Sequence, residues 1–451
     1  MKINVSENLL RLAESCPYPL YLVGGRVRDF IAKLDAHTFD NDICAPAGAD
    51  DFATRAQAVG FRIDSVYKNT GTVKLSCSGE DYEFTCFRSD EYVRGVHRPV
   101  NTYFTKDITL DAKRRDFRCN AVYYDIYGGQ FVDPLGGIRD IEGKILNCVD
   151  NSDKVFGEDG LRLMRLARIA AQTGFTPSAE CISGAKNNAK LIADISKERI
   201  YAELSAVLQA DSRYGIEGAQ YRGLKILDEI GVLDQIIPEL TLGRGMSQRS
   251  DIHAYDVLEH SFKTVLYADA SIRLAALLHD VGKPYCMLKN GNFYAHETEG
   301  AAIAPVICAR LRVPKKLAET VTALTKLHMY DLRCDAKENK VRRFIVKNLQ
   351  YLDGLMLLKQ ADYSACRDDL SVAPSVRKMT EILQKMKSEG VPLTVKQLNV
   401  RGNDLIECGC PPEKVGKVLD LLLMECCINT IKNQREALLN YAQKVAFKSI
   451  I

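Results

Sequence analysis

Asp40 and Asp42 are the two residues of this sequence best placed to hold a metal ion together. On a β-strand, residues two apart point to the same face, so both carboxylates would lie side by side. Two like charges that close need a cation between them. Hard carboxylate oxygens suit Mg²⁺, which also bridges nucleotide phosphates. The alternative is a polar loop, because Asp-Asn-Asp is also good turn composition.

A glycine pair precedes these aspartates, in residues 24–29 (GGRVRD). The apolar residues 20–23 predict a short buried strand, and the glycines allow a tight turn into a helix that begins near Arg26. Backbone amides at such a turn and helix N-terminus can hold a phosphate, and Arg28 can add a charge-assisted contact. A glycine turn without a ligand is the alternative.

A third carboxylate, Glu83, lies in an expected strand at 82–87, beside the strand of Asp40 and Asp42. It points away from the face that carries Phe84 and Cys86. Three carboxylates on neighbouring strands could hold two metal ions, one activating a hydroxyl and one neutralising leaving phosphates. An ordinary solvent-facing glutamate is the alternative.

Residues 114–121 (RRDFRCNA) form a basic segment just before an apolar strand. The adjacent arginines, Arg115 among them, can clamp a triphosphate, while Asp116 or Asn120 could read ribose hydroxyls. A solvated basic loop is the alternative.

Asp159, Arg162, Arg165 and Arg168 follow a three-residue spacing that predicts one face of a helix. A carboxylate beside an arginine matches the amine donor and ring acceptor on the Watson–Crick edges of cytosine and adenine, but not of uracil and guanine. Such a pair could therefore select C and A with protein alone. The alternative is a ladder of salt bridges within the helix.

Histidines concentrate between residues 253 and 328, where five of the seven occur. His260, the adjacent pair His279 and Asp280, and the later Asp362 resemble the HD metal-dependent phosphohydrolase domain, and His296 and His328 lie in the same region. Imidazole and carboxylate ligands suit a divalent transition metal that lowers the pKa of a bound water. A retained fold with an idle site is the alternative.

The chain of 451 residues is too long for one hydrophobic core. Strand and helix signals alternate up to about residue 150, and the apolar spacing is helical from there almost to the end. These patterns predict an α+β head followed by a long all-helical body. Strands are expected at 20–23, 72–77, 82–87, 121–125 and 129–132, a linker at 244–250, and a weaker break near 367–375.

The bulk composition, 46% hydrophobic and 26% charged, is typical of a soluble globular protein. A net charge of +3 means that any nucleic-acid surface must be local. Fifteen scattered cysteines, an odd number, indicate reduced thiols more than a disulfide framework. The first residues lack a signal-peptide apolar region and no apolar run could span a membrane, so we expect a cytoplasmic protein with no membrane partner.

Together the motifs resemble the bacterial class of the tRNA nucleotidyltransferase and poly(A) polymerase family. The matching pieces occur in the family's order between residue 20 and about 208: GGRVRD, DND, YEFTCFR, RRDFRCNA, EDGLR and SKERIYAEL. Residues 398–406 resemble the family's tRNA-facing tail. The chain departs from the pattern at Gly160, where a proline is usual, and at Arg118 and Cys119, which replace threonine and an aliphatic residue. These departures lie between the functional positions, so they put the reaction rate and the stiffness of these loops in doubt more than the reaction itself.

The resemblance implies a polymerase-β-like nucleotidyltransferase head in which Asp40 and Asp42 bind Mg²⁺. It implies nucleotide contacts from Gly25, Arg28, Arg115, Asp159, Arg162, Arg165 and Arg168. We expect four regions: the head at 1–150, a helical neck with nucleotide-base and RNA-binding motifs at 151–245, an HD-type helical domain at 246–370, and a helical tRNA-binding tail at 371–451.

The expected function is template-independent addition of CMP and AMP from CTP and ATP to the 3′ end of tRNA, releasing pyrophosphate. Addition of only part of CCA stays open, as does poly(A) addition, which would favour a strongly basic C-terminus; from Tyr441 onward the chain offers only Lys444 and Lys448. A metal-dependent phosphohydrolase acting on phosphate esters of RNA or nucleotides is another alternative. A non-catalytic RNA-binding protein is disfavoured, because it gains nothing from carboxylates facing phosphate. The expected cofactors are Mg²⁺ and, if the HD site is active, a second divalent transition metal.

Overall fold

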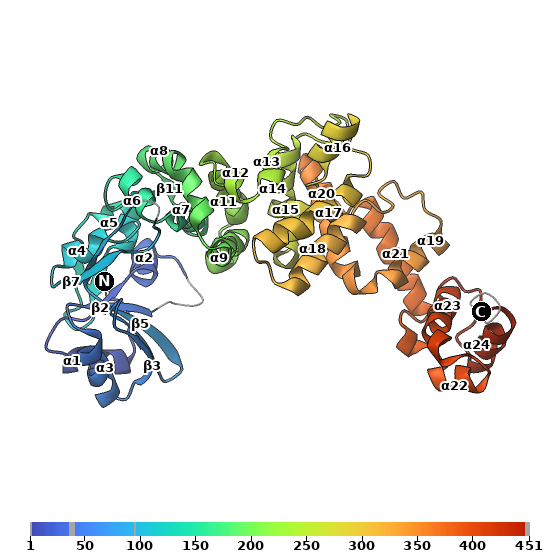
Figure 1. Ribbon diagram of the computed structural model, residues 1–451, viewed down its shortest axis with the longest axis horizontal. Helices are drawn as coiled ribbons and strands as arrows, with labels where there is room; N and C mark the ends of the chain where they lie inside the picture. The colour runs from blue at the N-terminus through green and yellow to red at the C-terminus, as the bar shows by residue number, and fades with distance from the viewer. Residues whose placement is uncertain (1, 36–40, 94–95, 447–451) are drawn as a thin grey trace. The chain divides into compact units, whose positions relative to one another are not determined.

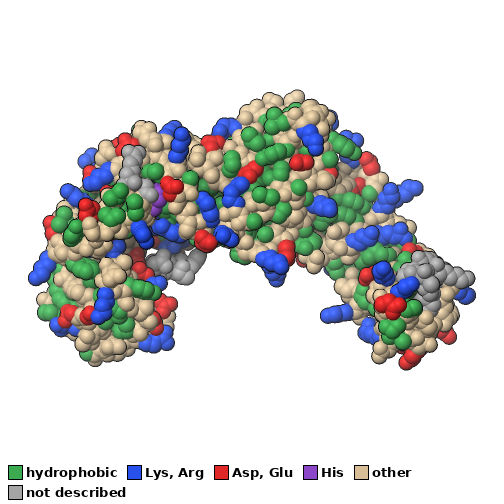
Figure 2. Space-filling view, in the orientation of Figure 1, with side chains coloured by type: hydrophobic (Ala, Val, Ile, Leu, Met, Phe, Trp, Pro, Cys, Tyr) green, Lys and Arg blue, Asp and Glu red, His purple; other side chains and the backbone are tan. Residues whose placement is uncertain are grey.

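A computed structural model describes residues 2–35, 41–93 and 96–446 of the chain (Figure 1). The chain forms two compact units. The first comprises Met1–Thr241 with Ile307–Val313, and the second comprises Leu242–Val306 with Pro314–Ile451. Lys and Arg side chains are dispersed among Asp and Glu on the face of each unit shown in Figure 2.

A seven-stranded mixed sheet with the order β3-β4-β5-β2-β1-β8-β9 forms the core of the first unit. Its strands are β1 Tyr21–Val23, β2 Asn41–Ala45, β3 Arg62–Tyr67, β4 Thr72–Cys77, β5 Glu80–Cys86, β8 Tyr123–Asp125 and β9 Phe131–Val132. Two small sheets accompany it: the hairpin of β6 Arg88–Glu91 and β7 Asn101–Phe104, and the pair β10 Ile145–Leu146 and β11 Thr176–Pro177.

The alternating sequence of β4 explains its place in this sheet. Val73 and Leu75 are buried while Lys74 between them is exposed, as period-two patterning requires. The next strand, β5, buries Phe84, whose ring stacks on Phe52 of α3. Strands β2 and β5 run parallel with Asp42 opposite Glu83. Side chains opposite each other point to the same face, so the sheet places these two carboxylates on one side.

Helices cover the sheet, and the chain that follows it is almost entirely helical, which confirms the expected α+β class. The head helices are α1 Glu7–Ser15, α2 Gly25–Ala32, α3 Ala49–Ala58, α4 Ile108–Lys113 and α5 Gly137–Glu142. Those that follow in the first unit are α6 Ser152–Glu158, α7 Leu161–Thr173, α8 Ala179–Asn188, α9 Lys197–Leu208, α10 Asp211–Tyr214, α11 Ala219–Glu229, α12 Leu233–Ile236 and α13 Pro238–Thr241.

The second unit is helical throughout its described part. Its helices are α14 Val257–Tyr267, α15 Arg273–Leu278, α16 Lys283–Asn290, α17 His296–Arg310, α18 Lys315–Leu327, α19 Glu338–Lys347, α20 Leu352–Arg367, α21 Pro374–Ser388, α22 Gly402–Glu407, α23 Val415–Cys427 and α24 Arg435–Tyr441. The last residues of α17 belong to the first unit. Among the helices that the structure describes, none is long and apolar enough to cross a bilayer.

Candidate active site

A strongly basic cavity of about 390 Å³ opens in the first unit, between the sheet and the helices that follow it. Eight arginines and three aspartates line it. The lining residues are Gly24, Gly25, Arg28, Asp42, Arg114, Arg115, Asp116, Asn120, Asp159, Leu161, Arg162, Arg165, Arg168, Ile169, Gln172, Arg199 and Arg213. Segments about 190 residues apart in sequence therefore meet around one space, and its charge suits a polyanion.

The glycine turn, Gly24 and Gly25, lines this cavity together with Asp42. Gly24 has a φ of +80°, which side chains disfavour, and a Cβ there would lie 3.1 Å from Asp42 Oδ2. Glycine thus lets the backbone approach the carboxylate and start α2 beside it. Asp40 lies outside the described residues. Glu83 is half exposed, 3.9 Å from Lys74 Nζ, and does not line the cavity.

Arg28 is held by a buried network rather than projecting freely. It donates to Asp29 Oδ1 at 2.6 Å, to Asn120 Oδ1 at 2.8 Å and to the Tyr214 hydroxyl at 3.2 Å. Tyr214 in turn donates to Asp29 Oδ2 at 2.5 Å and accepts from Arg213 Nε at 2.8 Å. Helix α10 is thereby joined by hydrogen bonds to the helix that follows the glycine turn.

Arg114 and Arg115 share one buried carboxylate, that of Asp111, at 2.7 and 3.1 Å. Tyr123 donates to the same carboxylate at 2.7 Å. Burial by itself would raise the pKa of Asp111, but Arg115 and Arg114 outweigh it and hold that pKa at about 2. The basic segment is therefore a braced wall of the cavity and not a solvated loop.

The expected helical face is correct for the three arginines and wrong for Asp159. Helix α7 begins at Leu161, and Asp159 precedes it in extended conformation, its Oδ1 accepting from the Leu161 amide. The extended Asp159, and not Gly160, whose backbone is helical, interrupts the helical geometry that the three-residue spacing assumed. Asp159 still lines the same cavity, and Arg199 of α9 donates to its Oδ2 at 3.2 Å.

The acidic partners of the α7 arginines lie outside α7, so no salt-bridge ladder runs along the helix, although Arg168 also donates to Gln172 within it at 3.2 Å. Arg165 pairs with Asp116 at 2.6 Å and Arg168 with Glu203 at 2.6 Å. Arg162 is buried and donates to Glu158 and to the Val155 carbonyl through one nitrogen. Its other terminal nitrogen donates to the carbonyl of Arg114. Arg162 thus ties α6 to the basic segment as well as facing the cavity.

Gly160, where the family favours proline, is explained by close packing. A Cβ at this position would lie 2.8 Å from the Leu191 carbonyl oxygen. The Gly160 amide also donates to His97 Nδ1 at 3.2 Å, a bond that proline could not make. The departure is therefore accommodated locally without moving Asp159 from the cavity.

The second unit brings the histidine and aspartate residues named above into one buried cluster. His260 Nε2 lies 3.0 Å from Asp362 Oδ1, and His279 Nε2 lies 3.1 Å from Asp280 Oδ2. His296 lies 3.2 Å from Asp280 and 3.3 Å from His328. Two groups within it, His260 with His279 and Asp362, and His279 with Asp280 and His328, are compact enough to hold a metal ion.

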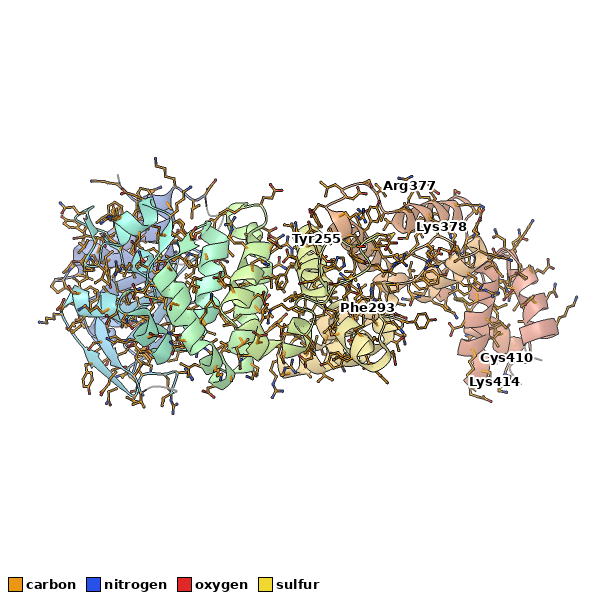
Figure 3. All side chains as sticks on the ribbon, turned by 90° about the horizontal axis from the view of Figure 1, so that it is seen from above. Tyr255, Phe293, Arg377, Lys378, Cys410 and Lys414 are labelled. Atoms are coloured by element: carbon orange, nitrogen blue, oxygen red, sulfur yellow. The ribbon has the colours of Figure 1, made fainter. Side chains whose placement is uncertain are left out.

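Lys283 adds a positive charge to this cluster. Its Nζ lies 2.5 Å from Asp280 Oδ2 and 5.9 Å from the ring centre of Phe293, which Figure 3 labels. Burial opposes ionisation of Asp280, but His279 and Lys283 keep its pKa well below the usual range. An ionised carboxylate among imidazoles fits a divalent transition metal.

No sequence pattern indicated several of the residues that lie at or beside these two sites. Arg199 belongs to a recognised motif, SKERIYAEL, but nothing local indicated that it reaches Asp159. Arg213 and Tyr214 carry no periodic or motif signal at all. In the second unit, His253 and Cys366 lie beside the cluster and were not assigned to it.

Comparison with known proteins identifies the family. The profile of the poly A polymerase head domain matches residues 20–147, that of the "Probable RNA and SrmB- binding site of polymerase A" matches 174–242, and that of the HD domain matches 252–365. The A-adding tRNA nucleotidyltransferase of Deinococcus radiodurans is 30% identical over 374 residues, 78% of each chain. The chain belongs to the tRNA nucleotidyltransferase and poly(A) polymerase family.

Other members of the tRNA nucleotidyltransferase family match over different lengths. The CCA-adding enzyme of Lactiplantibacillus plantarum is 25% identical over 452 residues, 99% of this chain and 97% of that one. Alignments with several other CCA-adding enzymes cover about half of each chain. The crystal structure of the Bacillus stearothermophilus CCA-adding enzyme in complex with CTP shares the fold, with a TM-score of 0.68 at 21% identity over 99% of both chains.

Proposed function

We propose that the basic cavity transfers CMP and AMP from CTP and ATP to the 3′-hydroxyl of tRNA and releases pyrophosphate. The observation that carries this proposal is the meeting of Asp42, the glycine turn and eight arginines around one cavity. Relatives named as A-adding and CCA-adding tRNA nucleotidyltransferases support the same substrates. Arginines in such number offer bidentate contacts to a triphosphate and to RNA phosphates.

In this reaction the 3′-oxygen of tRNA attacks the α-phosphorus in line, and the bond to pyrophosphate breaks. Negative charge shifts toward the leaving pyrophosphate, where the braced Arg115 and Arg28 would stabilise it without reorganising. Asp42 and, by its place in the sequence, Asp40 would hold Mg²⁺, which when bound neutralises phosphate charge and favours the ionised 3′-oxygen. The close approach of Gly24 to the Asp42 carboxylate fits such a site.

Base selection is proposed to fall to Asp159 and Arg162. Asp159 is held from two sides, by the Leu161 amide and by Arg199, and so presents a carboxylate in a defined orientation. Three of the five N–H groups of Arg162 are used within the protein, which leaves two to face a base. Arg165 and Arg168 lie further along the same helix and are proposed to contact the nucleotide.

Single-nucleotide extension tests the proposal. Three transcripts of one tRNA, ending before CCA, after C, or after CC, are each incubated with one labelled nucleotide. A CCA-adding enzyme incorporates C on the first two and A on the third. Incorporation of A on the third transcript alone would instead indicate an A-adding enzyme, and long A tails on every transcript a poly(A) polymerase. No incorporation on any transcript would refute nucleotidyl transfer.

A second activity, metal-dependent phosphoester hydrolysis, is favoured by the buried cluster in the second unit. Four histidines and two aspartates form it, and a divalent transition metal held by such residues would lower the pKa of a bound water. Hydrolysis of p-nitrophenyl phosphate and its diester, measured with Mn²⁺, Co²⁺ or Ni²⁺ in turn, tests this. If none of these metals supports hydrolysis, the second unit has no such activity and serves as a scaffold.

A further inference from the structure

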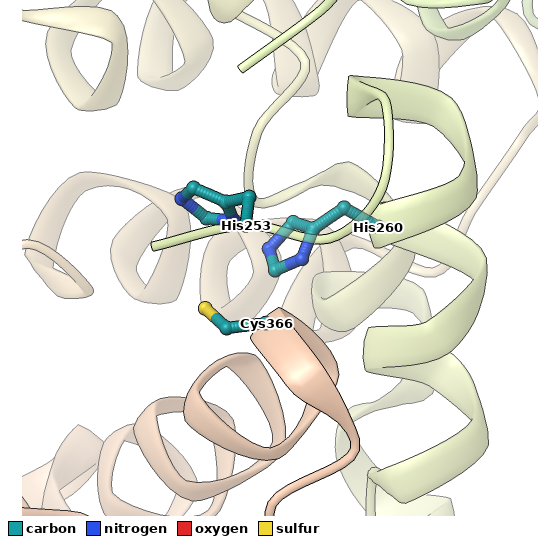
Figure 4. A group of neighbouring side chains, drawn as sticks. All are labelled: His253, His260 and Cys366. Carbon is teal, nitrogen blue, oxygen red and sulfur yellow. The ribbon is translucent and has the colours of Figure 1, made fainter. Parts of the chain in front are cut away.

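Beside the histidine and aspartate cluster, three softer ligands converge from three separate segments. His253 precedes α14, His260 lies on α14, and Cys366 lies in the last turn of α20. One ligand atom from each lies within 4.8 Å of the other two. Figure 4 shows their side chains turned toward a common point. We call these three residues the thiol corner.

Hydrogen bonds hold the thiol corner together independently of any ligand. The Ala254 amide donates to the Cys366 carbonyl at 2.9 Å. Arg367, the residue after Cys366, donates to the carbonyls of Ile252 and Ser250 at 3.2 and 2.7 Å. The segment that carries His253 is thus attached to the end of α20, so the nitrogen and sulfur donors are preorganised.

Both imidazole rings of the thiol corner have a nitrogen that lacks a hydrogen-bond partner in the described part of the chain. The Nδ1 atoms of His253 and His260 are buried and have no hydrogen-bond partner among the described residues. His260 is fully buried. A buried polar atom without a partner lowers the stability of the fold. A ligand bound to these ring nitrogens would offset that cost. The Cys366 thiol donates within its own helix to the Asp362 carbonyl at 3.3 Å, a bond that is easily given up.

We propose that the thiol corner is a binding site for a thiophilic divalent ion, Zn²⁺ by its donor set. Two imidazole nitrogens and one thiolate suit Zn²⁺ and exclude Mg²⁺, which prefers oxygen. The thiol proton leaves to solvent as the S–metal bond forms. Water completes a tetrahedral set, because Asp362 Oδ1 lies at Nε2, on the opposite side of the His260 ring from Nδ1.

This site differs from the neighbouring cluster in its donor atoms and shares only His260 with it. The cluster offers nitrogen and carboxylate oxygen, whereas the thiol corner alone offers sulfur. A metal probe that reports sulfur ligation therefore distinguishes the two. The site is also independent of nucleotide addition, because it lies in the other unit of the chain.

Co²⁺ binding to the reduced full chain tests the proposal, with Co²⁺ alone as the probe. A thiolate ligand produces a sulfur-to-cobalt charge-transfer absorption in the near ultraviolet. We expect this absorption in the unaltered chain, its displacement by Zn²⁺, its loss in Cys366→Ser, and its weakening in His253→Gln. Cys408→Ser, which alters a comparably exposed thiol elsewhere in the second unit, is the matched control and keeps it.

Co²⁺ bound without this absorption, or an absorption unchanged in Cys366→Ser, would overturn the proposal. A second measurement covers the case of a variant that fails to fold. Iodoacetamide labelling of the unaltered chain, read by mass spectrometry at Cys366, is expected to slow at least several-fold when Zn²⁺ is present. Equal labelling of Cys366 with and without Zn²⁺ would also overturn the site.

Discussion

Asp42 and Glu83 face each other across parallel strands, yet only Asp42 lines the cavity. Replacing Asp42 with Asn removes a charge without changing shape, so we expect intact folding and a loss of nucleotide incorporation worth several kcal/mol of transition-state stabilisation. Glu83→Gln is the matched variant, and its half-exposed place by Lys74 predicts a smaller loss. Rates are measured under single turnover. Near-normal turnover by folded Asp42→Asn would contradict the metal assignment.

Alanine substitutions at Asp159 and at Arg162 should both affect the choice of base, but only the second should also lower stability. Asp159→Ala is expected to relax discrimination against UTP and GTP by roughly 1–3 kcal/mol, because it removes a base contact and little packing. Arg162→Ala also removes three bonds between α6, α7 and the basic segment, so its thermal midpoint should fall as well. Competition between labelled nucleotides measures the discrimination. Full C and A preference in Asp159→Ala would contradict this assignment.

The buried carboxylate of Asp111 should make the free energy of unfolding depend on pH in the acid range. Its folded pKa of about 2 lies below its ordinary value of 3.8, so it contributes stability that is complete above pH 4 and lost as pH falls through 2. Asp111→Asn should therefore cost about 2 kcal/mol or more at pH 7, and the difference from the unaltered chain should shrink toward pH 2. Urea unfolding at a series of pH values measures it. A difference independent of pH would refute the role of this carboxylate.

At the scale of elements, the short helix α10 is joined to α2 through one phenol. The Tyr214 hydroxyl contacts Asp29, Arg28 and Arg213, two of which line the cavity. Tyr214→Phe keeps the ring and removes the hydroxyl, so Arg28 should lose part of its support. We expect KM for both nucleotides to rise about fivefold, in line with one hydrogen bond of about 1 kcal/mol, with kcat changed less.

Tyr127→Phe is the matched control for Tyr214, because Tyr127 is 69% exposed and lies outside the cavity lining. It should leave both kinetic parameters unchanged. Equal effects of the two substitutions, or a fall in kcat alone for Tyr214→Phe, would show that the hydroxyl does not position the nucleotide site.

At the scale of the whole molecule, the basic cavity and the histidine and aspartate cluster draw on different units and share no residue. His279→Ala should therefore spare nucleotide addition while removing any phosphoester hydrolysis and lowering transition-metal content. Some loss of stability is expected, since its partners become less satisfied. Metal analysis and both assays on one preparation check this. A folded variant that no longer adds nucleotides would show coupling between the sites.

The sequence by itself determined the features that depend on neighbours in the chain. Alternation of Val73 and Leu75 predicted their strand, and the glycine pair predicted the turn into α2, because periodicity and φ preference are local. The ordered motifs were enough to indicate the family and several of the residues that line the cavity, among them Arg28, Arg115 and Arg165. The helix predicted to include Asp159 begins two residues later, at Leu161, because Asp159 is extended and its carboxylate accepts from the Leu161 amide.

Only the tertiary structure decided which groups pair across the chain. Arg165 meets Asp116 from 49 residues away, and Tyr214 meets Asp29 from 185 residues away. His253 and Cys366, more than a hundred residues apart, meet beside His260. No local pattern encodes such contacts, because they arise when helices and strands bury their apolar faces against one another. The side chains brought together depend on that packing as a whole.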